Sequence, residues 1–431
     1  MTTIHRAQWI FDSPSPSELR QFERGAIAID GHGFILGVGK ATALIKLHPK
    51  ARVIDHGDDA VITPGFVDSH VHAPQLEMIA SAGYSLLEWL DKCTFPTEAK
   101  YSNKFYAARR WREFCDGLLR CGTTSAAVFA TSHTVATEAL LKIGDLSGLR
   151  LHIGKVLMDR NAPENLLQDA DQALEELDKL ILRWGDTSRT KVSMAVRFAP
   201  TSTPELLRGA GELLERHPGL LLQTHLGETQ DEVKWVKELF PQSKNYTSVY
   251  GDNGLVTQRS LLGHCLYLED EEVNLIRTSG AHVIHCPSSN FFLGSGLFNY
   301  SRMMQNGLSI ALGSDVGAGW DLSLQSTARC CYEAQALQKY FVKPSELLYL
   351  ATRAGAIALG CGADLGLLEK GHRADFLVHN LRGRSLVYGR AERSQSADEL
   401  MSALLFLGGE STLQATYVQG DCLFKRKFPK A

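Results

Sequence analysis

Apolar residues in the middle of the chain fall into strand-length runs separated by longer amphipathic stretches. The runs lie at about 64–72, 122–130, 149–158, 191–199, 219–227, 260–266, 281–287 and 308–314. Three of the stretches between them repeat apolar residues every three or four positions, the period of a helix with one buried face: NKFYAARRWREFCDGLLR, ENLLQDADQALEELDKLILRW and TPELLRGAGELLERH. Uninterrupted apolar runs are typical of parallel strands that are buried on both faces. The alternation predicts an α/β fold, a (β/α)₈ TIM-like barrel. An open doubly wound sheet is the alternative, weakened because no Gly-rich phosphate loop follows an early strand.

The two ends of the chain show a different pattern. Short strand-like runs with Gly-rich breaks dominate both ends: GAIAID, ARVIDH and AVITP near the start, ADFLVHN and ATYVQGDCLFKR near the finish. Neither end shows a long helical pattern. We expect residues 1–64 and 367–431 to meet in one small β-sandwich domain, and residues 65–366 to form the barrel domain.

Composition narrows the possible partners. The chain has 431 residues, 22% of them charged, and a net charge of -3, which gives no electrostatic reason to expect nucleic acid or an anionic membrane. The N-terminal stretch lacks the apolar core of a signal peptide, and no run approaches the roughly 20 apolar residues of a membrane span. Nine cysteines without a C-x-x-C pair indicate a reduced, cytoplasmic protein rather than a disulfide framework.

The first apolar run of the middle region ends in a His-x-His pair, His70 and His72. Side chains of a strand alternate between its faces, so residues two apart point the same way and can share one metal ion. Imidazole nitrogens suit Zn²⁺ or Fe²⁺. With 15 histidines in the chain, such spacing can also arise by chance, so the pair gains weight only from its context.

Three further candidate ligands lie at or near the ends of other apolar runs. His225 ends LLLQTH, His264 lies in LLGHC, and Asp315 ends SIALGSD. Chemistry in (β/α)₈ barrels is carried by residues at the carboxyl ends of the strands. The five side chains together predict a one-metal hydrolase site, in which an open coordination position holds the attacking water.

The residue types suggest separate roles around that metal. Asp315 would bind the metal and take a proton from the bound water, although a helix-capping turn residue is the plain alternative. His264 would either bind the metal or hold the nucleophilic water, and we favour the second role. Glu228, three residues beyond His225, would act as the general acid, unless it only stabilises the first turn of a helix.

The candidate residues lie within a series of longer segments, which follow one another in this order: PGFVDSHVHAPQ, LLEWLDKCTFPTEAKY, CGTTSAAVFAT, GKVLMDRN, VRFAPTS, THLGETQDEV, KNYTSVYGDNGLV, HCPSSN and GSDVGAG. Over roughly residues 60–375 the chain resembles the amidohydrolase superfamily, in a branch that acts on a free purine base. The resemblance implies a homodimeric zinc enzyme with one Zn²⁺ per chain, bound by His70, His72, His225 and Asp315. The implied reaction converts guanine and water to xanthine and ammonia.

The resemblance also implies a base pocket. Its residues would be Gln75, Arg197, Phe198 and Glu228, with His72, His225 and Asp315 also bordering the substrate. The Arg197 guanidinium can donate to the purine carbonyl oxygen, and Phe198 can pack on the ring. Trp89 and Phe95 follow the His-x-His strand and could border the same pocket.

Other members of the superfamily remain alternatives. A deaminase of 8-oxoguanine or another aminopurine, or an s-triazine hydrolase, would share the metal site and differ in the pocket. A non-catalytic scaffold would keep the barrel but usually loses metal ligands, all of which are present here.

Overall fold

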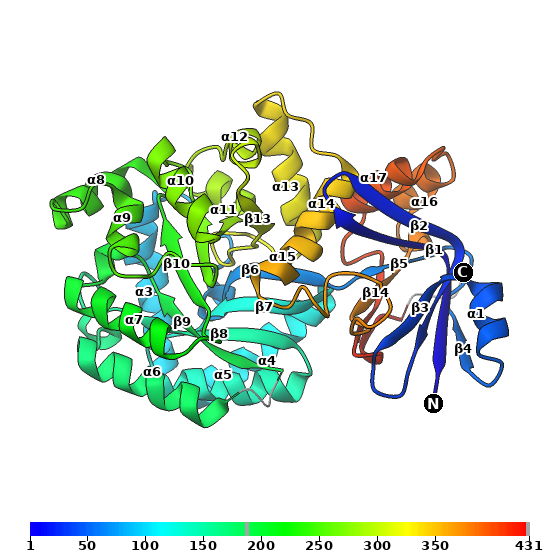
Figure 1. Ribbon diagram of the computed structural model, residues 1–431, viewed down its shortest axis with the longest axis horizontal. Helices are drawn as coiled ribbons and strands as arrows, with labels where there is room; N and C mark the ends of the chain where they lie inside the picture. The colour runs from blue at the N-terminus through cyan, green and yellow to red at the C-terminus, as the bar shows by residue number, and fades with distance from the viewer. Residues whose placement is uncertain (186–188, 428–431) are drawn as a thin grey trace.

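The computed structural model describes residues 1–185 and 189–427, which form two eight-stranded sheets with helices packed around one of them (Figure 1). One sheet uses strands from the middle of the chain, and the other uses strands from both ends. Among the described residues, no helix is both long and apolar enough to cross a lipid bilayer.

The middle of the chain forms the predicted barrel. Eight parallel strands follow one another around it in chain order. They are β6 (Phe66–His72), β7 (Thr123–Phe129), β8 (Arg150–Leu157), β9 (Lys191–Val196), β10 (Leu222–Leu226), β11 (Ser260–His264), β12 (His282–His285) and β13 (Ser309–Leu312). Each falls within one of the eight predicted runs, so the prediction of the barrel is confirmed.

Helices connect these strands on the outside of the barrel. The three amphipathic stretches of the sequence become α4 (Lys104–Arg120), α6 (Ala170–Trp184) and α7 (Pro204–Arg216). The others are α5 (Thr134–Ser147), α8 (Gln230–Leu239), α9 (Tyr246–Gly251), α10 (Asp270–Ser279), α11 (Pro287–Phe292), α12 (Tyr300–Gln305), α13 (Leu324–Leu337), α14 (Pro344–Ala351) and α15 (Arg353–Ala358). Short helical turns are η3 (Lys100–Ser102), η4 (Glu164–Leu166) and η5 (Ala199–Thr201).

The segment after β6 differs from the other connections because it contains five short helical pieces before α4. They are η1 (Ala73–Met78), α2 (Leu86–Trp89), the π-helical turn η2 (Leu90–Thr94), α3 (Phe95–Ala99) and η3. All five lie on the chain beyond the His-x-His pair, which ends the strand. This segment therefore builds one wall over the mouth of the barrel.

Backbone hydrogen bonds bring the last barrel strand back to the first. The amide of Asp315 donates to the carbonyl of His70 at 2.8 Å, and the amide of His72 donates to the carbonyl of Val316 at 2.9 Å. Both bonds lie just beyond β13. They fix the end of the eighth strand directly beside the His-x-His pair of the first.

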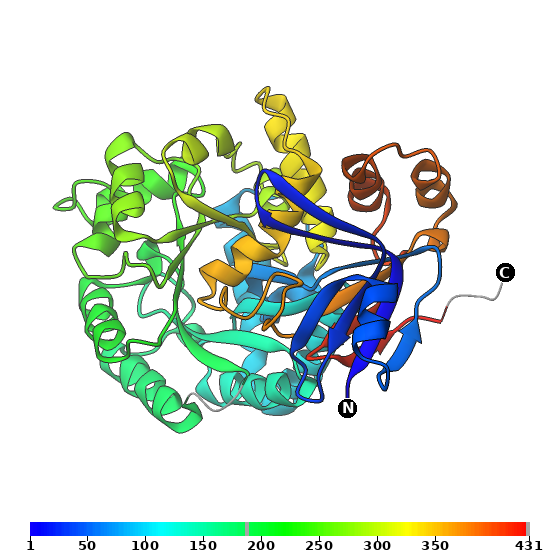
Figure 2. The same ribbon diagram turned by 45° about the vertical axis from the view of Figure 1, so that its right-hand side comes forward.

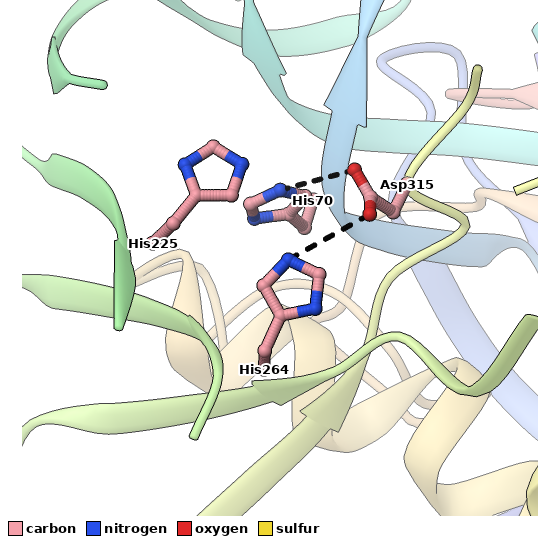
Figure 3. Close-up of side chains that lie close together, drawn as sticks. All are labelled: His70, His225, His264 and Asp315. Carbon is pink, nitrogen blue, oxygen red and sulfur yellow. Dashed lines mark ion pairs between the residues drawn. The ribbon is translucent and has the colours of Figure 1, made fainter. Parts of the chain in front are cut away.

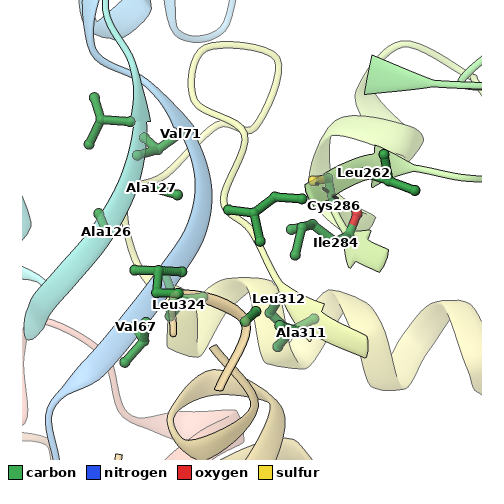
Figure 4. Packing of buried hydrophobic residues seen from close by; sticks show 14 of the residues in the cluster. Val67, Val71, Ala126, Ala127, Leu262, Ile284, Cys286, Ala311, Leu312 and Leu324 are labelled. Carbon is green, nitrogen blue, oxygen red and sulfur yellow. Dashed lines mark hydrogen bonds between the residues drawn. The ribbon is translucent and has the colours of Figure 1, made fainter. Parts of the chain in front are cut away.

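The barrel wall is held by apolar side chains that are fully buried. Val67 and Val71 of β6 lie across from Ile284 of β12 and Leu312 of β13, and Leu324 of α13 belongs to the same cluster (Figure 4). Burying a side chain of this size stabilises the fold by about 1.5–3 kcal/mol. A rigid wall of this kind holds the strand ends, and therefore the polar side chains on them, in fixed positions.

Strands from both ends of the chain meet in the second sheet, as the sequence predicts (Figure 2). Its strands are β1 (Thr3–Ser15), β2 (Glu18–Ile29), β3 (Ile35–Lys40), β4 (Arg52–Asp55), β5 (Ala60–Pro64), β14 (Phe376–Asn380), β15 (Leu413–Val418) and β16 (Asp421–Lys425), with the short helix α1 (Ala41–Leu47) beside them. β14, from the C-terminal end, pairs antiparallel with β5, from the N-terminal end. All eight strands belong to one connected ladder.

The expectation that neither end contains a long helical pattern is wrong. Between β14 and β15 the chain forms η6 (Leu381–Gly383), α16 (Ser385–Ala391) and α17 (Ala397–Leu407). Apolar residues run nearly continuously through the second half of α17, so its sequence shows no alternation between a buried and an exposed face. Ser396 caps the helix by accepting from the amide of Glu399, a local signal that the apolar pattern does not reveal.

Candidate active site

The predicted metal ligands converge at the carboxyl ends of four barrel strands. Ligand atoms of His70, His225, His264 and Asp315 all lie within 4.8 Å of one another (Figure 3). His72 joins them, with its Nε2 3.1 Å from Nε2 of His225 and 3.4 Å from Oδ1 of Asp315. All five residues that the strand-end argument selected therefore share one small volume.

Hydrogen bonds on the outer side of the cluster orient two of its imidazoles. Nδ1 of His225 lies 2.6 Å from the carbonyl oxygen of Arg197, so this nitrogen carries the proton and donates it. Nδ1 of His264 likewise donates to Oδ1 of Asn290 at 2.9 Å. Both rings therefore turn an Nε2 lone pair toward the cluster, which is the arrangement that ligating histidines usually have.

Several nitrogens of the cluster have no hydrogen-bond partner among the described residues. They include Nε2 of His70 and of His264, which are both fully buried. A buried polar atom without a partner is costly, and native proteins normally satisfy it. A divalent cation among these nitrogens and Asp315 would satisfy them together, so the donor set fits a zinc-type site.

Glycines create the space that His70 occupies. A methyl group on Gly313 would lie 2.6 Å from Cβ of His70, and one on Gly263 would lie 2.8 Å from its Cε1. His264 and Asp315 themselves have positive φ angles of 69° and 49°. Non-glycine residues rarely adopt such backbone conformations, and they concentrate at functional sites, where the surrounding structure holds them.

Burial and mutual contact set the charges of the cluster. Burial lowers the pKa of His70, His72 and His225, which favours the neutral imidazole that can bind a metal. For Asp315, burial opposes ionisation, but the contacts with His70 outweigh it and hold the carboxyl pKa below its usual range. For His264, burial is outweighed by Glu228 and Asp315, which raise its pKa.

Glu228 lies at the edge of the same cluster, where the sequence predicts a general acid. Its Oε2 is 3.5 Å from Nε2 of His264, and its Oε1 accepts from the Ser295 hydroxyl at 3.1 Å. Burial, opposed by His264 and reinforced by the nearby Asp315, raises the pKa of Glu228 to about 7. A carboxyl group with such a pKa can both give and accept a proton near neutral pH.

A cavity of about 390 Å³ opens beside the cluster. His72, His225, Glu228 and Asp315 line one end of it, and Gln75, Arg197 and Phe198 line another part. Trp89, Leu86, Leu90, Leu293 and Ala318 supply apolar walls. Its mixed lining of apolar walls and a few polar groups is that of a small-molecule site. The seven residues that the resemblance places at the substrate all border it.

Arg197 has a partner that the sequence analysis missed. Its Nη1 donates to Oε2 of Glu98 at 2.7 Å, and both side chains are buried. The other oxygen of Glu98 accepts from Nε2 of Gln75 at 2.9 Å. Phe95 does not line the cavity itself, but its ring lies under the Arg197 guanidinium at 5.5 Å.

Other supporting residues were also missed. Asp68, two residues before His70, accepts from the amide and the hydroxyl of Ser314 and thereby ties β6 to the segment that carries Asp315. Asn290 and Ser295 orient His264 and Glu228. Asp68 could have been found from its place in Asp68-Ser69-His70, and Asn290 from its place at the end of HCPSSN. Ser295 lies outside the segments that carry the resemblance.

The fold is a (β/α)₈ barrel, and the His and Asp side chains at its strand ends form a cluster that could hold a metal ion. Residues 61–423 match the model of the amidohydrolase family. The chain belongs to this family.

Individual members of the family are similar to most of the chain. The chain is 38% identical over 366 residues to the guanine deaminase of Escherichia coli (strain K12), covering 85% of this chain and 83% of that protein. It is 32% identical over 372 residues to guanine deaminase of Homo sapiens, covering 83% and 81%. Among solved structures, guanine deaminase from C. acetobutylicum with guanine bound in the active site superposes with a TM-score of 0.92 at 30% identity, covering 98% of this chain and 100% of that one.

Proposed function

We propose that this protein hydrolyses free guanine to xanthine and ammonia. The observation that carries the proposal is the pocket itself, in which a metal-type His/Asp cluster and the buried carboxyl of Glu228 share one cavity with Arg197. The relatives from Escherichia coli and Homo sapiens are guanine deaminases, and the C. acetobutylicum structure is described as a guanine deaminase with guanine bound.

We propose that one Zn²⁺ per chain is held by His70, His72, His225 and Asp315, with Fe²⁺ as the alternative metal. The buried, partnerless nitrogens of the cluster support this assignment, as does the outward hydrogen bond of His225. A bound zinc ion would supply a Lewis acid that lowers the pKa of water to about 7. His264, which faces both carboxylates, would hold the attacking water rather than the metal.

The side chains of the protein then handle the protons. Asp315 accepts one proton from the water as it attacks the ring carbon that bears the amine. Glu228, which borders both the cluster and the cavity, gives its proton to the neighbouring ring nitrogen. It then takes the remaining water proton from the hydroxyl group on the attacked carbon and passes it to the amine, so that ammonia leaves and the carbonyl group forms. The proton held by Asp315 returns to Glu228 and restores the site. Arg197 and Gln75 hold the opposite side of the base, and Phe198 packs on its ring.

The direct test uses metal-replete protein with guanine, adenine and cytosine. We expect the absorbance change of guanine-to-xanthine conversion together with one ammonia released per guanine, and no ammonia from adenine or cytosine. Release of ammonia from 8-oxoguanine or a triazine, with guanine inert, would assign the protein to one of the neighbouring activities. Metal-replete protein that is inert towards every base would contradict the proposal and favour the scaffold alternative.

We also propose a cytoplasmic homodimer with two domains, residues 1–64 with 367–431 and residues 65–366. All nine cysteines are free, which suits a reducing compartment. The two separate sheets support the division into domains, while the dimer rests on the resemblance alone. Sedimentation analysis of the purified protein would test the oligomeric state.

A further inference from the structure

Glu98 is a buried carboxylate near the pocket that touches neither the metal cluster nor the surface. It lies on the short helix α3, and its side chain is only 2% exposed. One oxygen accepts from Arg197 Nη1 at 2.7 Å and the other accepts from Gln75 Nε2 at 2.9 Å. Both partners line the cavity, so Glu98 holds from behind the two polar side chains that face the base.

The amide of Gln75 is fixed from a second direction. Its Oε1 accepts from the backbone amide of Gly317 at 3.1 Å. A backbone N–H can only donate, and a carboxylate can only accept. Turning the Gln75 amide over would therefore set its NH₂ against the Gly317 N–H and its carbonyl oxygen against the Glu98 carboxylate. Glu98 and Gly317 together allow only one orientation of the Gln75 amide.

The fixed orientation determines what this side of the pocket can offer a ligand. The carbonyl oxygen of Gln75 is turned to the Gly317 amide, and one N–H of its amide is used by Glu98, which leaves the second N–H for the cavity. The guanidinium of Arg197 has donors and no acceptor, and only one of its nitrogens is bonded to Glu98. This side of the pocket therefore presents donors.

A donor-only surface selects between purines. Guanine carries acceptors at both O6 and N7 along one edge, whereas adenine places an N6 amine donor beside N7. We propose that Glu98 is the specificity-determining positioning residue of the pocket, which fixes Gln75 and Arg197 as donors and so selects a 6-oxopurine over a 6-aminopurine. The inference rests on the proposed function and adds the residue that sets its substrate preference.

The substitution Glu98→Gln tests the proposal because it keeps the shape and removes the charge. Two substrates are compared, guanine and 2,6-diaminopurine, which keeps the 2-amine but exchanges the 6-oxo acceptor for an amine donor. We expect kcat/KM for guanine to fall by about tenfold or more, chiefly through KM, because a charge-assisted hydrogen bond is weakened. For 2,6-diaminopurine we expect little change. Glu98→Asp, which restores the carboxylate, should recover part of the preference.

Exposed Glu88 on α2 gives a matched control, since its carboxylate caps that helix and pairs with the exposed side chain of Lys92, away from the residues that line the polar side of the cavity. Glu88→Gln should leave kcat/KM for both substrates unchanged. If Glu98→Gln lowers kcat/KM for both substrates by the same factor while the metal content stays normal, Glu98 is merely structural and the proposal is overturned. The proposal is also overturned if the Glu98→Gln protein prefers guanine over 2,6-diaminopurine as strongly as the wild type does.

A second measurement needs no variant and separates this inference from the proposed function. Hypoxanthine has the O6 and N7 acceptors but no 2-amine to hydrolyse, and adenine is its 6-amino counterpart. We expect metal-replete wild-type protein to bind hypoxanthine at least about tenfold more tightly than adenine in calorimetric titrations. If both bases bind equally well, the donor-only surface does not select between purines, and this inference is overturned even if guanine is deaminated. If the protein binds hypoxanthine more tightly than adenine but does not act on guanine, only the proposed function is overturned.

Discussion

The pocket has two ends that are built in different ways. At the reacting end, His70, His225 and Asp315 project from the carboxyl ends of barrel strands and carry nearly all of the candidate chemistry. At the recognition end, Gln75 and Glu98 belong to the short helices after β6, whereas Arg197 and Phe198 follow the barrel strand β9. The first end depends on the barrel, and the second depends on one connecting segment that packs against it.

The difference teaches where change is tolerated. Strand ends are positioned by a wall of fully buried side chains, so substituting one residue at the reacting end should leave the other strand ends in place. The recognition end is a chain of hydrogen bonds through a single carboxylate, so one substitution there can alter the choice of base without disturbing the barrel. Each substitution below should affect one end of the pocket and spare the other.

The largest effect is expected from removing a ligand at the reacting end. His70→Ala or His225→Ala should abolish both bound metal and deamination, because the remaining side chains leave the site incomplete. Metal analysis by mass spectrometry and ammonia release are the measurements. Full activity in metal-free protein would contradict the role of the cluster. The comparison is a substitution of His285, a buried residue of β12 that is not part of the cluster. The metal content of this variant should be normal.

Glu228→Gln should have the next largest effect, since it keeps the shape of the side chain but cannot cycle a proton. General acid–base groups contribute about 10²–10⁴-fold, so kcat should fall by that factor with metal content unchanged. The raised pKa of Glu228, about 7, also predicts that the protonated form is lost as the pH rises through that value. Near-normal turnover in a metal-replete variant would show that the proton takes another route.

Most of the fold could be predicted because local pattern and tertiary structure agree. All eight barrel strands fall within the apolar runs, and α4, α6 and α7 coincide with the amphipathic stretches. The helix α17 was missed because apolar residues run nearly continuously through its second half, including the partly exposed Phe406 and Leu407, so the sequence shows no amphipathic period. Periodicity detects a helix whose apolar residues are confined to one face, and it fails where they are not.

The two ends of the pocket differ in the same way. The reacting end was predictable because a His-x-His pair and single His or Asp residues end separate apolar runs, a pattern visible in the sequence. Glu98 lies in LLEWLDKCTFPTEAKY, one of the segments that carry the resemblance, but its role was not predicted, because its partner Arg197 lies 99 positions away in the sequence. Only the packing of α3 over the barrel shows that this carboxylate is buried.

Arg197→Ala should weaken guanine binding and leave the reacting end intact. Loss of a charged hydrogen bond to the purine oxygen should cost about 1.5–3 kcal/mol in kcat/KM, mainly through KM. Metal content should not change, because only the backbone carbonyl of Arg197 contacts a candidate ligand, His225, and alanine retains it. Arg197→Lys is the matched comparison, since it keeps the charge but not the planar fork. An unchanged KM and kcat/KM for guanine would rule out the contact.

The smallest effect is expected for Gln75→Met, which replaces a neutral amide by an apolar chain of similar length. A neutral hydrogen bond contributes about 0.5–1.5 kcal/mol, so kcat/KM for guanine should fall by less than in Arg197→Ala. Glu98 keeps its bond to Arg197 in this variant, so part of the preference for guanine over 2,6-diaminopurine should survive, unlike in Glu98→Gln. Steady-state kinetics with both substrates distinguish the two variants. If Gln75→Met removes the preference as completely as Glu98→Gln does, recognition depends on the glutamine amide rather than on the carboxylate behind it.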